Sequence, residues 1–122
     1  MSEYYYDSYA IIEYLNNNPS FISYFEEDTG VITLFTLAEV YYTTLREHGL
    51  EKAETIFETI YPLIVAVSKE TIKKAMQLRF YYKSLKISYA DAIGYQVALE
   101  RKIPFLTGDK AFKNLPAVEF RK

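Results

Sequence analysis

Short apolar runs recur along the chain, and they are rich in aromatic and β-branched residues. Such runs are typical of buried strands, because these side chains pack well on a pleated surface. The pattern predicts strands at Tyr4–Tyr6, Val31–Leu34, Leu63–Val67 and Ile103–Thr107, and a short last strand at Val118–Phe120.

Between these runs, apolar residues recur every three or four positions among polar ones. This is the spacing of helices that bury one face. Proline, glycine and asparagine separate several of the segments, as expected at helix ends. The predicted helices are Ser8–Leu15, Pro19–Glu26, Thr36–Glu47, Leu50–Ile60, Lys69–Leu85 and Ser88–Arg101.

The last two predicted helices differ in how much of their surface should be buried. In the helix over 69–85, we expect Ile72, Met76 and Phe80 to face inward, with lysines outside. The helix over 88–101 carries no charge between Ala92 and Leu99, so it should be buried on nearly all sides.

Strands and helices alternate along the chain, and the strands are short and apolar throughout. This order predicts an α/β fold, a parallel sheet with helices on both faces. A chain of 122 residues is long enough for one hydrophobic core, so we expect a single domain over residues 1–122.

The composition excludes several kinds of functional site. The chain has no cysteine, which excludes disulfides, thiolate catalysis and cysteine-based zinc sites. Its one histidine, His48, lies next to Gly49 at the predicted end of a helix, where its side chain interacts favourably with the helix dipole. The chain starts without a signal-peptide pattern and has no uncharged run near the roughly 20 residues of a membrane span. We therefore expect a cytoplasmic protein.

Charge is divided unevenly along the chain. Residues 1–68 hold eleven acidic and two basic side chains, and residues 69–122 hold five acidic and twelve basic ones. A basic half can indicate a polyanionic partner, but solvated helix faces give the same pattern. The thirteen tyrosines fit core packing, an interface or stacking on nucleobases. For self-association we single out Tyr14, Tyr41 and Tyr42.

Four acidic residues lie at strand ends or in the first turns of helices. Asp7 and Asp109 each follow a predicted strand, Glu39 lies one turn beyond another, and Asp91 lies in the first turn of the buried helix. In a parallel sheet these ends gather at one edge, where ligands bind. The four carboxyl groups are therefore predicted to meet.

Helix capping would place acids at the same positions. Thr36–Glu39 and Ser88–Asp91 both match the capping-box pattern, and Asp7 and Asp109 could be N-caps. If the four acids do cluster, their mutual repulsion calls for a hard divalent cation with oxygen ligands. The cluster therefore predicts Mg²⁺ or Mn²⁺ and disfavours zinc.

Three stretches carry a resemblance to a known family. They are YYYDSYAIIEYL, TLFTLAEVYY and LKISYADAIGYQVALERKIPFLTGDKAF, and the most specific part has one acid in the buried helix and another after Thr-Gly. In this order they resemble the PIN domain, and among PIN proteins the ribonuclease toxins called VapC. The resemblance implies a three-layer α/β/α sandwich around a mostly parallel sheet.

The resemblance also implies functions for particular residues. Asp7, Glu39, Asp91 and Asp109 match the acids that drive RNA hydrolysis in the family. Asp7, Asp91 and Asp109 would hold Mg²⁺ or Mn²⁺, and Glu39 would bind metal or orient the attacking water. The products would carry a 5′-phosphate and a 3′-hydroxyl. Ser8 and Thr107 match supporting positions.

Further expectations concern the partners. Lys83, Lys86, Lys110 and Lys113 could grip RNA phosphates, although solvated surface lysines would look the same. The resemblance implies a homodimer, and an antitoxin protein whose tail blocks the acidic cleft.

Other functions fit parts of the pattern. A housekeeping RNA-processing nuclease would share the chemistry without the toxin role. A catalytically silent scaffold or binding module would have no reason to bind Mn²⁺. A signalling receiver is disfavoured, because it needs an acidic pair after the first strand and an acid after the third.

Overall fold

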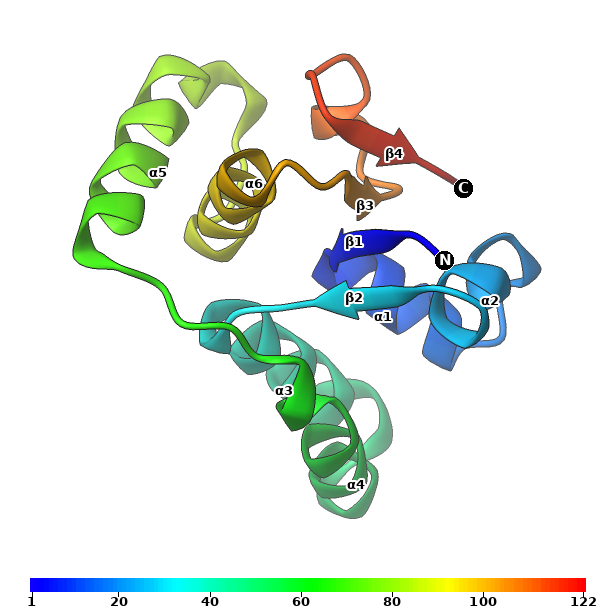
Figure 1. Cartoon of the computed structure of the whole chain (residues 1–122). Coiled ribbons are helices and arrows are strands. Elements are labelled where there is room, and N and C mark those ends of the chain that lie inside the picture. Colours follow the sequence, from blue (N-terminus) through cyan, green and yellow to red (C-terminus); the bar gives the residue numbers. More distant parts are fainter.

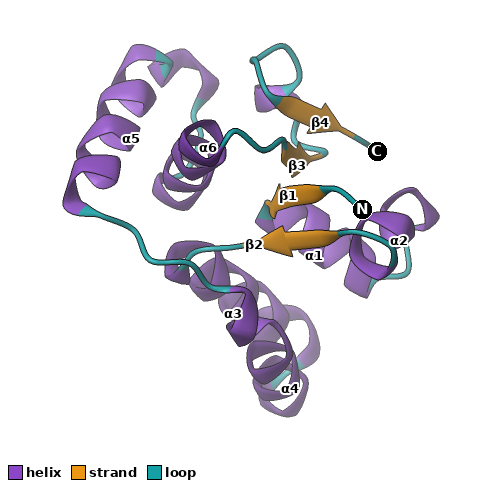
Figure 2. Ribbon diagram, viewed as in Figure 1, coloured by secondary structure: helices purple, strands orange, loops and turns teal.

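The computed structural model describes residues 1–122 and contains one sheet of four parallel strands. Their spatial order is β2-β1-β3-β4, and helices cover both faces of the sheet (Figures 1 and 2). Tyr5 in β1 is paired with Val31 of β2 and with Phe105 of β3. The predicted α/β class is confirmed. The strands are β1 (Glu3–Tyr6), β2 (Thr29–Val31), β3 (Phe105–Thr107) and β4 (Val118–Phe120).

Six α-helices connect the strands, with three short 3-10 turns between them. No helix combines the length and apolar character needed to cross a bilayer. The α-helices are α1 (Ser8–Leu15), α2 (Pro19–Glu26), α3 (Leu34–His48), α4 (Leu50–Ile60), α5 (Lys69–Tyr81) and α6 (Tyr89–Arg101). The 3-10 turns are η1 (Tyr61–Leu63), η2 (Lys83–Leu85) and η3 (Lys110–Phe112).

The sheet separates two hydrophobic cores, because successive strand residues point to opposite faces. Tyr5 and Phe105 belong to the core under α5 and α6. Their neighbours Tyr6 and Leu106 belong to the core shared with α1, α2, α3 and α4. The result is three layers, with the sheet between two groups of helices (Figure 1).

One buried tyrosine ties the sheet to the start of α3. The Tyr5 hydroxyl lies 3.0 Å from Thr33 Oγ1 and 2.8 Å from Thr36 Oγ1, and it accepts the Thr33 N–H at 3.1 Å. Burial raises the pKa of Tyr5 to about 12, so the hydroxyl remains protonated. These bonds fix the first turns of α3, which carries Glu39, against β1.

The apolar run at 63–67 is not a strand, so that prediction is wrong. Only Ile64 forms a single parallel bridge, to Ile32, next to the turn η1. The side chains of Val65 and Val67 pack against the core instead. An apolar run reports burial, and burial does not require a strand partner.

Several boundaries also differ from prediction, and the two largest differences are at the ends of one strand and one helix. The strand predicted at Val31–Leu34 ends at Val31, because Thr33 caps α3 and Leu34 begins it. The helix predicted to reach Leu85 ends at Tyr81. Phe80 is 73% exposed, not inward, and the ammonium group of Lys83 lies over its ring. The buried character predicted for α6 is confirmed.

Gly94 allows α6 to lie directly on the ring of Tyr5. A Cβ atom at Gly94 would lie 2.5 Å from Tyr5 Cε1, and the ring cannot move without breaking its hydrogen bonds. In an open helix, glycine to alanine stabilises by up to about 1 kcal/mol. For Gly94→Ala we expect the opposite sign, a loss of about 1–3 kcal/mol in urea unfolding. A gain in stability would show that this contact is loose.

Candidate active site

The carboxyl ends of the parallel strands form an acidic cleft at the point where the strand order reverses. From β1 the chain continues to β2 on one side of β1, and it later returns to form β3 on the other side. Such switch points are the usual ligand sites of open α/β sheets. A cavity of about 250 Å³ opens here. It is lined by Asp7, Ser8, Tyr9, Ile12, Glu13, Thr43, Asp91 and Asp109.

Asp7 is the most deeply buried acid of the cleft. It immediately follows β1, is 3% exposed, and accepts a hydrogen bond of 2.6 Å from Thr107 Oγ1. Its side chain does not cap α1, so the capping explanation fails for this residue. Burial, and then repulsion from Asp91, raise the pKa of Asp7 well above its usual range. A buried carboxyl without a basic partner is costly to ionise.

Asp91 serves both the helix end and the cleft. Its backbone N–H donates to Ser88 Oγ at 3.0 Å, and its carboxylate accepts the Ser88 N–H at 3.4 Å, which completes the predicted capping box. Burial raises the pKa of Asp91, and the charge of Asp109 adds to the shift. Asp91 and Asp7 interact directly, so the two carboxyls compete for one proton.

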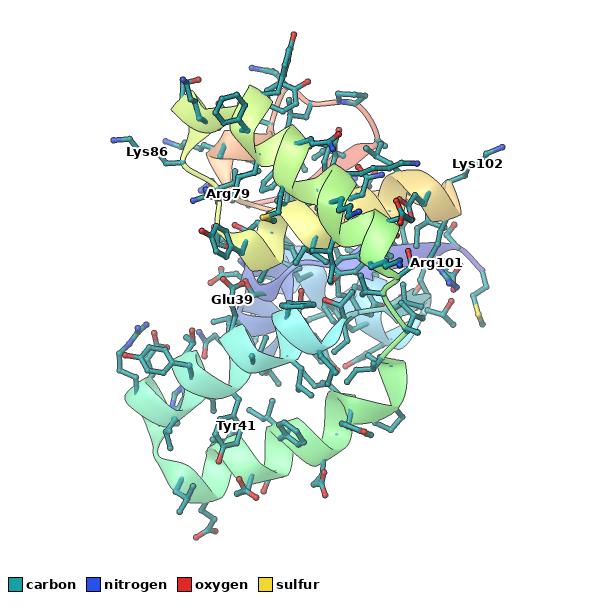
Figure 3. All side chains as sticks on the ribbon, turned by 90° about the vertical axis from the view of Figure 1, so that its left-hand side faces the viewer. Glu39, Tyr41, Arg79, Lys86, Arg101 and Lys102 are labelled. Carbon is teal, nitrogen blue, oxygen red and sulfur yellow. The ribbon has the colours of Figure 1, made fainter.

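Glu39 approaches the same group from α3. The capping box predicted for it is absent, because the side chain of Thr33 caps this helix. The Glu39 carboxylate accepts a hydrogen bond of 3.0 Å from Ser8 Oγ. Partial burial raises the pKa of Glu39, and repulsion from Asp91 raises it further. Figure 3 shows Glu39 where the α3–α4 pair meets the rest of the molecule.

Thr107 joins two of the acids. Its hydroxyl donates to Asp7 and accepts the backbone N–H of Asp109 at 3.0 Å. The side chain of Asp109 in turn accepts the Ala111 N–H at 3.0 Å, as the N-cap of η3. One threonine hydroxyl thereby sets the positions of carboxyl groups that follow two different strands.

The carboxyl groups of the cleft are ligands that suit a hard divalent cation, although they do not converge on one point. No three acidic or histidine side chains are arranged to enclose an ion directly. Burial raises the pKa values of Asp7 and Asp91, and a cation placed between such carboxyl groups would stabilise their charged forms. A shared ion requires the side chains to turn inward or to bind through water.

The four lysines predicted to bind RNA form two exposed pairs. Lys83 and Lys86 lie in and after η2, between α5 and α6. Lys110 and Lys113 lie in and after η3, directly beyond Asp109. The first pair precedes α6, which carries Asp91, and the second follows Asp109. Their binding function stays a prediction.

Sequence reasoning missed some residues of the cleft, notably Tyr9, Glu13 and Thr43. Tyr9 and Glu13 are four residues apart on α1, so they share a helix face that begins next to Asp7. That spacing was visible in the sequence. Thr43 gives no such signal, because its place depends on how α3 packs against α1.

The fold and the cleft together define an α/β protein with an acidic site at the sheet switch point. Residues 4–118 match the PIN domain, and the chain belongs to this family. PIN domains are generally nucleases. A chain in a toxin–antitoxin complex from Klebsiella pneumoniae has a similar structure, with a TM-score of 0.73 and 20% sequence identity. The match covers 98% of this chain and 96% of that one, which shows a shared fold.

A second similarity is partial. The chain is 28% identical over 76 residues to an (S)-coclaurine N-methyltransferase from Thalictrum flavum subsp. glaucum. This match covers 62% of the chain and only 21% of the methyltransferase. Since so little of that protein is covered, its activity does not transfer to this chain.

Proposed function

We propose that this protein is a metal-dependent endoribonuclease, the VapC-type toxin of a toxin–antitoxin pair, with residues 1–122 forming one nuclease domain that acts on cytoplasmic RNA. The observation that carries the proposal is the meeting of Asp7, Glu39, Asp91 and Asp109 from four distant segments. Three of them have raised pKa values and no basic partner. Such clusters are costly for stability and frequent at functional sites.

Asp7, Asp91 and Asp109 are the residues proposed to hold Mg²⁺ or Mn²⁺. When bound, such an ion lowers the pKa of water and offsets negative charge on the phosphate during hydrolysis. The protein's contribution is to position the carboxylates. Thr107 keeps Asp7 oriented by its hydrogen bond of 2.6 Å, and the capping box with Ser88 holds Asp91 at the helix end.

Glu39 and the lysines have other proposed functions. The Ser8 hydroxyl holds Glu39 at the edge of the cleft, where its carboxylate can orient a water for attack. Lys110 and Lys113, next to Asp109, would hold RNA phosphates on one side of the cleft, and Lys83 and Lys86 on the other. Attack in line with the leaving oxygen would give a 5′-phosphate and a 3′-hydroxyl.

The toxin role is supported by the likeness to a chain from a toxin–antitoxin complex. It predicts an antitoxin whose tail occupies the acidic cleft, and a homodimer. Of the tyrosines expected at the dimer contact, Tyr14 stacks on Phe25 and Tyr41 packs on Phe57, so both are engaged within the chain. A housekeeping RNA-processing nuclease remains the second candidate, because its site would be the same.

The test is co-expression with the product of the neighbouring upstream reading frame. We expect the two proteins to copurify, and the freed chain to cleave RNA with Mn²⁺ but not with EDTA. Cleavage without any copurifying partner would favour the housekeeping nuclease. If calorimetry detects no Mn²⁺ binding and no RNA is cut, the domain is a scaffold and the proposal fails.

A further inference from the structure

Two exposed tyrosines carry an arginine on one face of the ring. Tyr89 is 63% exposed, and the guanidinium carbon of Arg79 lies 4.6 Å from its ring centroid. Tyr42 is 62% exposed, with Arg46 at 5.5 Å. Both rings remain open to solvent although burial of a tyrosine is favourable. Neither ring is needed for the core of the protein.

Tyr89 belongs to the element that carries Asp91. It is the first residue of α6, directly after the N-cap Ser88 and two residues before Asp91. Arg79 does not swing freely, because its Nε donates a hydrogen bond of 2.8 Å to the carbonyl of Ile87. The arginine and the ring therefore form a fixed pair beside the cleft.

Tyr42 belongs to the element that carries Glu39. The two are three residues apart in α3, so they are neighbours on one helix face. The next residue, Thr43, lines the acidic cleft. Arg46 continues the same face by one more turn and also contacts Glu47 at 3.4 Å. This pair thus borders the cleft from the side opposite α6, with less free positive charge than the Arg79–Tyr89 pair.

Basic side chains beside the acidic cleft suit an anionic strand. Figure 3 shows Arg79 and Lys86 on the same edge as Glu39, whereas Arg101 and Lys102 lie on the opposite one. Lys86 is exposed, and Lys83 next to it packs its ammonium over Phe80 at 5.2 Å. Aromatic rings interleaved with cations are the features that bind single-stranded nucleic acid.

We propose that Tyr89 and Tyr42 are nucleobase-stacking sites for single-stranded RNA, one on each side of the carboxyl cleft. This inference rests on the proposed nuclease function. The cations hold phosphates, while each open ring face takes an unpaired base. A base within a duplex is already stacked on its neighbours, so the surface discriminates against paired RNA. Tyr89 is the stronger site, because Arg79 and Lys86 are not neutralised.

The test is binding of a fluorescent single-stranded RNA of about 12 nucleotides, measured by anisotropy in EDTA so that the strand stays intact. We expect Tyr89→Leu to weaken binding by about 5- to 100-fold, and Tyr42→Leu by less. Tyr89→Phe should bind like the wild type, since stacking needs the ring and not the hydroxyl. The control is Tyr61→Leu, a tyrosine of similar exposure (51%) in η1, away from the elements that carry the acids and without a cation over its ring.

A second binding experiment locates the nucleotide whose base stacks on Tyr89. Replacing single nucleotides by abasic ones should weaken wild-type binding at one position and leave Tyr89→Leu unaffected there, because the same contact is already lost. Equal binding by Tyr89→Leu and the wild type, with RNA still cleaved, would overturn the stacking inference alone. Absence of both cleavage and binding in the wild type would overturn the nuclease function as well. If light scattering shows that Tyr42→Leu dissociates a dimer without changing RNA binding, the α3 site is wrong.

Discussion

Asp91→Asn is expected to lower the rate of RNA cleavage in Mn²⁺ by about 10²- to 10³-fold, the usual effect of removing one electrostatic element of an active site. The substitution keeps the fold, because an asparagine oxygen can still accept the Ser88 N–H at the helix end. It removes the charge that faces Asp7 and that a divalent cation would use. Initial rates on a labelled RNA, with folding checked by circular dichroism, measure the effect.

The matched control for this loss of charge is Glu100→Gln. Glu100 lies near the other end of α6 and accepts hydrogen bonds from Thr71 and Gln96, away from the cleft. We expect its cleavage rate to stay within about twofold of the wild type, as for surface changes in general. Equal rates for Asp91→Asn and the wild type would remove Asp91 from the mechanism or reveal a contaminating nuclease.

Asp7→Asn is expected to stabilise the metal-free protein at neutral pH while abolishing its response to Mn²⁺. The neutral amide can accept from Thr107, as the carboxylate does now, and can donate to Asp91 instead of repelling it. Removing an uncompensated buried charge should raise the free energy of unfolding by about 1–3 kcal/mol. Thermal melts in EDTA measure the gain.

The pH dependence follows from the direction of the pKa shift. Because the pKa of Asp7 is higher in the folded protein than in the unfolded chain, the folded state binds more protons between the two values. Metal-free wild type therefore loses stability as the pH rises from the ordinary aspartate range through the raised value. Asp7→Asn removes the contribution of Asp7 to this pH dependence of stability. Glu39 and Asp91 also have raised pKa values, so they leave a smaller pH dependence of the same sign.

Metal should make the wild type more stable than Asp7→Asn, the reverse of the order expected in EDTA. A cation that binds only the folded state raises the melting temperature of the wild type in proportion to the logarithm of its concentration, and the variant should not respond. Asp28→Asn is the control, because Asp28 is the one aspartate outside the cleft and only accepts a hydrogen bond from the Ser2 N–H. A lower melting point for Asp7→Asn in EDTA would mean that the buried carboxylate is already well compensated.

Helix capping and a place in the cleft are compatible for the same acids. Asp91 completes the capping box that its sequence predicts, and it also lines the cleft. Asp109 likewise caps η3 and lines the cleft. Asp7 makes no capping bond. A local motif therefore does not argue against a functional site, because a side chain at a helix start in an open sheet already points toward the ligand-binding edge.

Two of the wrong predictions share one cause. The apolar run at 63–67 has the composition of a strand, yet only Ile64 finds a partner. Phe80 continues the inward spacing of Met76, yet the helix ends next to it and leaves it exposed. Composition and spacing describe what a segment needs to bury. They do not report whether another segment is present to cover it.

Local spacing and residue type were enough to predict the alternation of strands and helices, the buried character of α6 and the positions of the acids at element ends. They could not predict that Thr107 bonds both Asp7 and Asp109, that Ser8 holds Glu39, or that burial raises three carboxyl pKa values. Those properties arise between residues up to a hundred positions apart, so they depend on the packing of the whole chain.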